Sequence, residues 1–124
     1  MKRLMLALAF SFAAISMADA AGDPAKGEKV FRICSACHTA DAATNRVGPY
    51  LKGVVGRKTA TAEGYSYSPA MKAKGDGGLV WTEANLDAYL ADPRGFVPNN
   101  KMAFAGLKKP DDRADVIAYL KTKM

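Results

Sequence analysis

The sequence has very little cysteine and histidine. Its 124 residues include two cysteines and a single histidine, and all three fall within one pentapeptide, Cys34-Ser35-Ala36-Cys37-His38. A structural zinc site normally needs four nitrogen, sulfur or oxygen ligands, often as two separated Cys or His pairs. Since no second pair exists, a structural zinc site is disfavoured and the pentapeptide needs another explanation.

Long apolar runs are also scarce, because the sequence has only one. A basic pair at positions 2 and 3 precedes a mostly apolar run over residues 4–18, and Ala18-Asp19-Ala20 follows as an A-x-A-like site. A bilayer-spanning helix needs about 20 apolar residues, so this run is short for an anchor and typical of a secretory signal. We expect residues 1–20 to be a cleaved signal peptide. Residues 21–124 would then form one domain exported to the periplasm, with only peripheral membrane association.

Acidic residues are outnumbered by basic ones. The formal net charge is +6, and it falls to +5 without residues 1–20, which hold two basic residues and one acidic residue. The basic residues are scattered rather than gathered in one run, and an exported chain rarely meets nucleic acid. We therefore expect acidic faces of proteins or anionic membrane surfaces as partners, and no nucleic acid. About a hundred residues are near the lower size limit for a core made of side chains alone, so a cofactor could fill part of it.

Helix signals are clear near the two ends of the predicted domain. Asp23 and Pro24 predict an N-cap followed by proline at the first helical position, for a helix that reaches about Cys34. Pro110 opens the last helix, which has acidic residues in its first turn and basic residues near its end. The apolar stripe of that helix is Val116, Ile117 and Leu120.

The middle of the chain has few helix signals. From residue 39 to residue 80 glycine and proline are too dense for long regular elements, which predicts loops with one short helix near residues 69–74. A further helix is expected to begin after Thr82 and to end at Asp92-Pro93. Residues 96–106 are predicted to form a loop.

Three chemistries compete for the pentapeptide once zinc is set aside. A Cys-x-x-Cys oxidoreductase would need a βαβ setting that this sequence does not predict. A structural disulfide would close so small a ring that it would restrict the unfolded chain little, and it would leave His38 unexplained. Covalent haem attachment uses all three residues, because Cys34 and Cys37 can each add to a vinyl group while His38 binds the iron. The sequence favours this haem hypothesis.

The second axial ligand of such a haem has to be sought elsewhere. His38 is the only histidine and both thiols are used, so the candidates beyond residue 20 are Met71, Met102 and Met124. Met124 is the last residue, whereas Met102 lies in a proline-anchored loop between two predicted helices. Met102 is the predicted ligand, and Met71 stays open as the alternative.

The order of motifs along the chain resembles that of class I c-type cytochromes, and among these the bacterial cytochrome c2 and mitochondrial cytochrome c group. The segments that carry the resemblance are GDPAKGEKVF, CSACHT, VGPYLKGVVGRK, GYSYSPAMKAKG, WTEANLDAYLADP, VPNNKMAFAG and RADVIAYLK. It implies an all-α fold of short helices and loops around one haem c, attached through Cys34 and Cys37. It further implies that the first and last helices cross, with Gly27 and Phe31 against Val116 and Tyr119.

The resemblance also implies roles for individual pocket residues. The Pro49 carbonyl would accept the free ring N–H of His38 and orient that ligand, Tyr89 would lie close to Met102, and Phe104 would lie beside the exposed haem edge. Buried haem propionates need hydrogen-bond donors. The residues at the donor positions are Arg57, Tyr65, Tyr67, Trp81 and Asn100.

With both axial positions filled no substrate can reach the iron, which predicts an electron carrier rather than an enzyme. The resemblance implies a monomer that shuttles between a membrane quinol-oxidising complex (a quinol-cytochrome c reductase) and a terminal oxidase, a photosynthetic reaction centre or a similar acceptor. A basic ring around the haem edge would guide docking. Its members are Lys29, Arg46, Arg94, Lys101, Lys108 and Lys109.

Two other functions stay open at this point. A haem enzyme or gas-binding protein would need an open sixth position, which Met102 argues against unless its loop opens. An electron-accepting subunit of a periplasmic dehydrogenase would use the same domain with one committed donor.

Overall fold

The computed structural model describes residue 9 and residues 22–124, and apart from residue 9 the predicted signal peptide lies outside the described residues. The regular elements are α1 (Pro24–Phe31), the 3-10 turn η2 (Cys34–Ala36), α2 (Pro69–Asp76), α3 (Glu83–Ala91), α4 (Pro93–Phe96) and α5 (Pro110–Lys121). Within this part of the chain, strand pairing is limited to one bridge between Lys58 and Val80. No helix in it has the length and hydrophobicity to cross a membrane. The predicted all-α class is confirmed.

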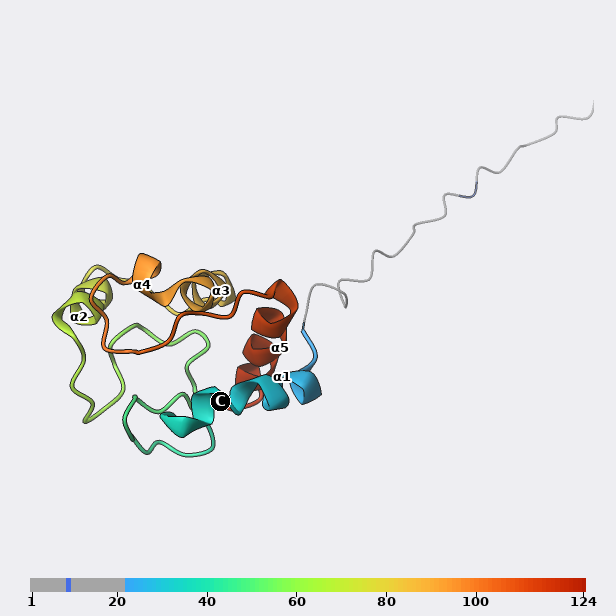
Figure 1. Ribbon diagram of the computed structural model, residues 1–124, viewed down its shortest axis with the longest axis horizontal. Coiled ribbons are helices and arrows are strands. Elements are labelled where there is room, and N and C mark those ends of the chain that lie inside the picture. Colours follow the sequence, from blue (N-terminus) through green and yellow to red (C-terminus); the bar gives the residue numbers. More distant parts are fainter. Residues whose placement is uncertain (1–8, 10–21) are drawn as a thin grey trace, which may run out of the picture.

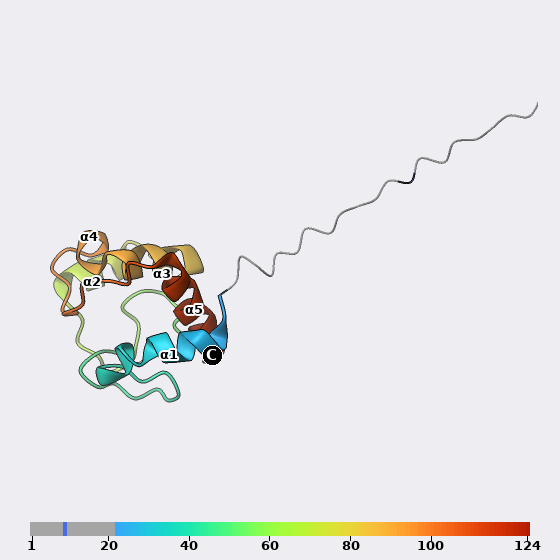
Figure 2. The same ribbon diagram turned by 45° about the vertical axis from the view of Figure 1, so that its right-hand side comes forward.

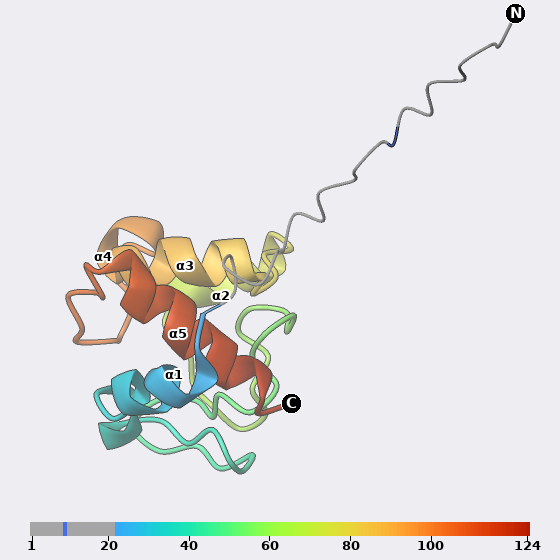
Figure 3. The ribbon, with the colours of Figure 1, turned by 90° about the vertical axis from the view of Figure 1, so that its right-hand side faces the viewer.

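Helices α1 and α5 cross closely, as the resemblance implies (Figure 3). Helix α1 begins as expected, since the Asp23 carboxylate accepts hydrogen bonds from the first-turn N–H groups and Pro24 stands at the first helical position. A Cβ atom at Gly27 would overlap the Asp115 carbonyl of α5, so only glycine permits this approach. The rings of Phe31 and Tyr119 lie 5.2 Å apart at the crossing.

Helix α4 was not predicted, and this corrects the sequence-based assignment around Asp92. Helix α3 does end there, but the Asp92 carboxylate also accepts a hydrogen bond from the Gly95 N–H at 3.0 Å and caps the new turn. Pro93 then occupies the first position of α4, where its missing N–H costs nothing. Asp92-Pro93 therefore ends one helix and starts the next.

The elements surround the core from several sides. Helices α1 and α5 lie at one end of the molecule and α2 at the other, with α3 and α4 along one edge and the loops that follow α1 along the opposite edge (Figures 1 and 2). Helix α2 begins at the Ser68 cap, whose hydroxyl accepts the Met71 N–H, and it runs two residues beyond the predicted end at Lys74. In the core, the Trp81 ring lies 5.0 Å from that of Tyr89 and 6.2 Å from that of Phe96.

The carboxyl end of the chain is tied to the first long loop. The Lys123 carbonyl accepts the Gly53 N–H at 2.6 Å, and the Lys123 ammonium donates to the Asp41 carboxylate at 2.6 Å. The last helix is therefore linked both to α1 and to the loop that follows the pentapeptide.

Candidate cofactor-binding site

The pentapeptide forms a tight turn directly after α1. The N–H groups of Cys37 and His38 both donate to the Cys34 carbonyl, at 3.1 and 3.0 Å. Both thiols are free and half-buried, and burial raises the pKa of the Cys34 thiol. The two thiols and the imidazole thus belong to one short segment held by its own backbone hydrogen bonds.

His38 is oriented by the loop that follows. Its Nδ1 lies 2.7 Å from the Pro49 carbonyl oxygen. Because a carbonyl can only accept, Nδ1 carries the proton and the lone pair of the neutral imidazole is on Nε2. Burial lowers the pKa of His38, which favours this neutral form. A Cβ at Gly48 would overlap the ring, so the glycine before Pro49 gives His38 its space.

Met102 is held by hydrogen bonds at the backbone of its loop. Its N–H donates to the Asn100 side-chain oxygen at 2.8 Å, and the Asn100 amide nitrogen donates to the carbonyls of Pro93 and Val97, both at 2.9 Å. The Tyr89 hydroxyl lies 4.0 Å from the Met102 sulfur, and burial raises the pKa of Tyr89 to about 12. The expected proximity of Tyr89 and Met102 is present. Asn100 donates its amide protons to the backbone and thereby supports the Met102 loop.

The two competing methionines lie on other segments of the chain. Met71 is on α2 and packs half-buried against the core. Met124 is 70% exposed at the end of the chain, an environment that suits a buried ligand poorly.

Arg57 lies on the loop that carries Pro49. Its terminal nitrogens donate to the carbonyls of Tyr50 and Lys52, at 3.0 and 3.2 Å. Backbone hydrogen bonds join it to the Trp81 segment, since the Trp81 N–H donates to the Arg57 carbonyl at 2.8 Å. Burial lowers the pKa of Arg57. The structure thus brings two of the predicted propionate-binding residues together.

The tyrosine pair also belongs to this group of loops. The Tyr65 hydroxyl donates to the Val47 carbonyl at 3.0 Å, the Tyr67 hydroxyl accepts the Ala62 N–H at 2.9 Å, and the two rings meet edge to face. Burial is the main cause that raises the pKa of Tyr67. The Tyr67 O–H proton is not needed for the bond from Ala62 and can serve another acceptor.

Two buried polar atoms in the described residues, Arg57 Nε and Thr59 Oγ1, have no hydrogen-bond partner. Buried donors of this kind normally have an acceptor, and the carboxylates of a haem would supply one. Half-buried apolar side chains such as Leu51 and Phe104 pack against the hydrophobic core and suit an apolar ring. The residues present therefore fit a haem. Thr59 was not predicted, since no sequence signal distinguishes it from other threonines.

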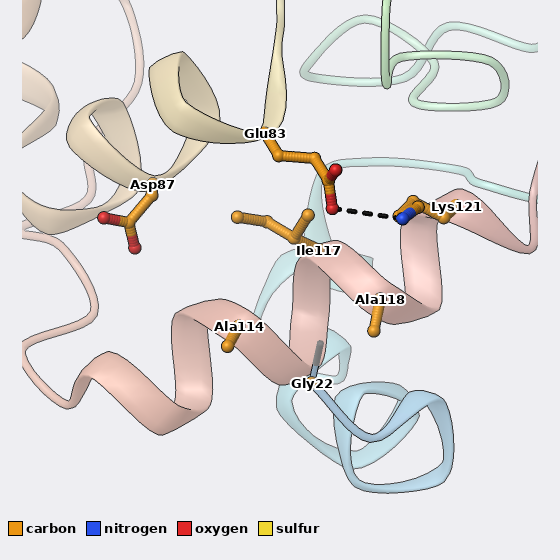
Figure 4. A pocket seen from close by; sticks show the side chains of 7 residues that line it. All are labelled: Gly22, Glu83, Asp87, Ala114, Ile117, Ala118 and Lys121. Carbon is orange, nitrogen blue, oxygen red and sulfur yellow. Dashed lines mark ion pairs between the residues drawn. The ribbon is translucent and has the colours of Figure 1, made fainter. Parts of the chain in front are cut away.

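A shallow depression elsewhere on the surface is lined by residues other than those of the predicted site (Figure 4). It lies between α3 and α5, and the ion pair between Glu83 and Lys121, 3.2 Å long, runs along it. None of the predicted site residues lines it, so it is not the cofactor site.

The six residues of the predicted basic ring are all exposed. Several are tied to loops near the site. Arg46 donates to the Ser35 carbonyl within the pentapeptide at 2.7 Å, and Lys101 donates to the Ser66 carbonyl at 2.9 Å. Lys108 donates to the carbonyls of Ala91 and Ala105. These three charges are therefore fixed near the pentapeptide or the Met102 loop.

Comparison with known proteins agrees with this geometry. Residues 24–123 match the family model described as cytochrome c. The chain is 52% identical over 105 residues to a cytochrome c2 of Rhodomicrobium vannielii, covering 84% of this chain and 82% of that protein. Its fold is similar to cytochrome cH from Methylobacterium extorquens, with a TM-score of 0.75 and 50% identity over 82% of this chain and all of that one. A cytochrome c2 from Rhodospirillum centenum has a TM-score of 0.76 and 44% identity, covering 82% of this chain and 98% of that one.

Proposed function

The chain belongs to the cytochrome c family, and on that premise we propose that it is an exported shuttle for single electrons. Proteins of this family transfer electrons and are not enzymes, and they bind one covalent haem c. The chain is thus a cytochrome c2-like electron carrier with Cys34 and Cys37 as its attachment residues. The observation that carries the proposal is the Pro49 hydrogen bond, which leaves His38 Nε2 available beside two free thiols.

The axial ligands in this proposal are His38 and Met102. Haem supplies a single Fe(III)/Fe(II) couple, and a thioether ligand favours the reduced state and raises the potential. Asn100 anchors the backbone of Met102 on one side and Tyr89 approaches its sulfur on the other. With His38 and Met102 both bound to the iron, substrates and gases would be kept from the metal.

We further propose that residues 1–20 are a cleaved signal peptide and that the mature protein works in the periplasm as a monomer. The support is the basic pair, the short apolar run and the A-x-A-like site in the sequence. The proposed donor is a membrane quinol-oxidising complex, and the proposed acceptor is a terminal oxidase, a photosynthetic reaction centre or a similar protein.

The basic ring is proposed to guide these encounters. Its six side chains are exposed, and two of them, Arg46 and Lys101, are bonded to loops of the site, so their charges act on a partner through solvent. Exposed charges are screened at distances beyond about 8 Å at physiological ionic strength. The rate of electron transfer to an acidic partner should therefore fall as salt rises. A rate that is insensitive to salt would contradict docking through this ring.

The decisive experiment is the visible spectrum of the reduced, haem-loaded protein before and after carbon monoxide. We expect the wild type to keep a low-spin spectrum, because Met102 closes the sixth position. Met102→Ala should form a CO adduct promptly, whereas the matched control Met71→Leu should behave as wild type. A CO adduct in Met71→Leu but not in Met102→Ala would make Met71 the ligand. A prompt adduct in the wild type would instead favour a gas-binding protein or haem enzyme.

A further inference from the structure

Tyr50 makes three contacts that the proposed electron carrier does not yet explain. The Arg57 guanidinium carbon lies 5.0 Å from the centre of the Tyr50 ring, in a cation–π arrangement. The Tyr50 carbonyl accepts a hydrogen bond from Arg57, and the Tyr50 N–H donates to the Asn45 side-chain oxygen, both at 3.0 Å. Asn45 in turn donates to the Glu63 carbonyl at 2.8 Å, so the segment is fixed to the neighbouring loop.

These contacts leave the guanidinium little freedom. It is a rigid, planar group with five N–H donors. One terminal nitrogen is bonded to the Tyr50 carbonyl, the other to the Lys52 carbonyl, and one face is occupied by the Tyr50 ring. Among the donors that remain, Nε–H is buried and has no protein partner. The direction of the Nε–H is therefore determined by the contacts of the two terminal nitrogens and of the guanidinium face.

Pro49 and Tyr50 are consecutive residues, and the backbone carbonyl of each accepts a hydrogen bond from a side chain of the site. The Pro49 carbonyl accepts from the imidazole of His38, and the next carbonyl accepts from the guanidinium of Arg57. One dipeptide thus orients both the proposed iron ligand and the buried donor.

We propose that Tyr50 is a positioning residue that holds Arg57 with its Nε–H directed into the cofactor site, where it donates to a haem carboxylate. The inference rests on the proposed haem site. The Tyr50 ring and the Asn45 hydrogen bond act through Arg57, and Tyr50 itself need not touch the cofactor.

The test uses the reduced, diamagnetic holoprotein labelled with nitrogen-15 in arginine. Hydrogen exchange of the Arg57 Nε–H is measured in wild type, Tyr50→Leu and Tyr50→Phe. We expect exchange to be roughly threefold to tenfold faster in Tyr50→Leu, as expected for loss of a partly buried cation–π contact. In Tyr50→Phe, which keeps the ring and the backbone bonds, exchange should stay at the wild-type rate.

Arg113 provides an internal reference in the same samples. Its Nε donates to the Asp87 carboxylate at 2.7 Å, remote from Tyr50 in the ion pair between α5 and α3. Its exchange should not change in either variant. Equal acceleration of both arginines would show general loosening and would overturn the proposal, as would unchanged Arg57 exchange in Tyr50→Leu.

The midpoint potential gives a second readout that a merely structural role would not move. A loosened guanidinium stabilises the reduced state less, so Tyr50→Leu should lower the potential while Tyr50→Phe keeps it. In an Arg57→Gln background Tyr50→Leu should have no further effect on the midpoint potential, and a full additional shift there would contradict the proposal.

If Tyr50→Leu fails to load haem, Asn45→Ala removes the anchor of the Tyr50 backbone and should accelerate Arg57 exchange in the same way. A CO adduct in the wild type would refute the proposed function. Contrary results in the exchange and midpoint-potential experiments would refute only the role of Tyr50.

Discussion

Two regions of this molecule, the α1–α5 crossing and the loops around the site, are stabilised by different kinds of interaction. Helices α1 and α5 meet through close apolar packing, with Gly27 against the backbone of α5 and buried Val116 beside the Phe31–Tyr119 contact. The loops around the pentapeptide and Met102 rely instead on side chains that donate to backbone carbonyls. Examples are the bonds from Arg57 to Tyr50, from Asn100 to Pro93 and from Lys101 to Ser66.

The difference shows which of the two regions can satisfy its packing and hydrogen bonds with protein atoms alone. At the helix crossing the close contacts are between protein atoms. Around the loops, Arg57 and Thr59 keep buried polar atoms without a protein partner, and such atoms cost free energy until an acceptor arrives. We therefore expect the helix pair to respond to changes of volume, and the loops to respond to changes in hydrogen bonding and backbone conformation.

The largest expected effect comes from adding volume at the helix crossing. Gly27→Val would force the side chain into the Asp115 carbonyl, so the free energy of unfolding should fall by about 3 kcal/mol. The control Gly77→Ala stands at the end of α2, where a Cβ would meet the Ala73 carbonyl oxygen at an ordinary 3.4 Å. Urea unfolding should show less than about 0.5 kcal/mol for the control. Equal losses in both variants would contradict the importance of the crossing.

A second effect tests the boundary between helices and loops, where Tyr89 of α3 approaches Met102. Burial raises the pKa of Tyr89 to about 12 from its ordinary value of 10. The unfolded chain loses this proton first, so the stabilisation is complete below pH 10 and is lost as pH rises towards 12. The loss amounts to about 2 to 3 kcal/mol.

Tyr89→Phe removes this contribution while keeping the ring. Unfolding free energies measured at pH 9 and pH 11.5 should therefore fall less steeply in Tyr89→Phe than in wild type. Equal slopes in the two proteins would show that the phenol is not the group responsible.

A third effect concerns hydrogen bonding in the Met102 loop. Asn100→Ala removes the bonds to Pro93, Val97 and Met102, and we expect a loss of about 1 to 2 kcal/mol in unfolding free energy. CO should also bind faster, because the backbone of Met102 is no longer anchored. The neighbouring Asn99→Gly is the control, since Asn99 has a φ of 61° that glycine adopts freely. If both variants bind CO at the wild-type rate, Asn100 does not hold the loop closed.

The smallest effect is a gain in stability within the loops. Ala60 has a φ of 61°, a left-handed conformation that costs an L-residue about 1 to 2 kcal/mol. Ala60→Gly should therefore raise the free energy of unfolding by about 0.5 to 1 kcal/mol after the extra chain entropy of glycine is subtracted. Gly78→Ala, at a φ of 90° in open space, should have the opposite sign. The same sign in both would contradict backbone strain as the cause.

The parts of the fold that could be predicted are those whose signals are local. Asp23 before Pro24 and Thr82 before Glu83 are caps that act within one turn, and both helices begin there. The miss at α4 has a local cause too. Asp92-Pro93 repeats the cap-and-proline pattern of Asp23-Pro24, and a proline in that pattern starts a helix as readily as it ends the one before.

The site residues also divide into those with a local sequence signal and those without one. Cys34, Cys37 and His38 are recognisable because their chemistry depends on their spacing in the chain. Thr59 and Tyr50 could not be found, because their significance depends on which loop segments meet after folding. The hydrogen bonds of Asn100 could not be foreseen for the same reason, since its amide protons are donated to the carbonyls of Pro93 and Val97, whose positions exist only once α4 has formed.

The crossing of α1 and α5 joins the first helix of the described chain to the last. These helices have 8 and 12 residues, and isolated helices shorter than about 12 to 15 residues are marginal in water. Each helix is therefore expected to be marginal until the other has been synthesised. A chain that leaves the ribosome with α1 first therefore forms its principal helix pair only after α5 has been made. If the chain is exported as proposed, this late pairing would leave it open to threading through a membrane and to haem attachment at Cys34 and Cys37.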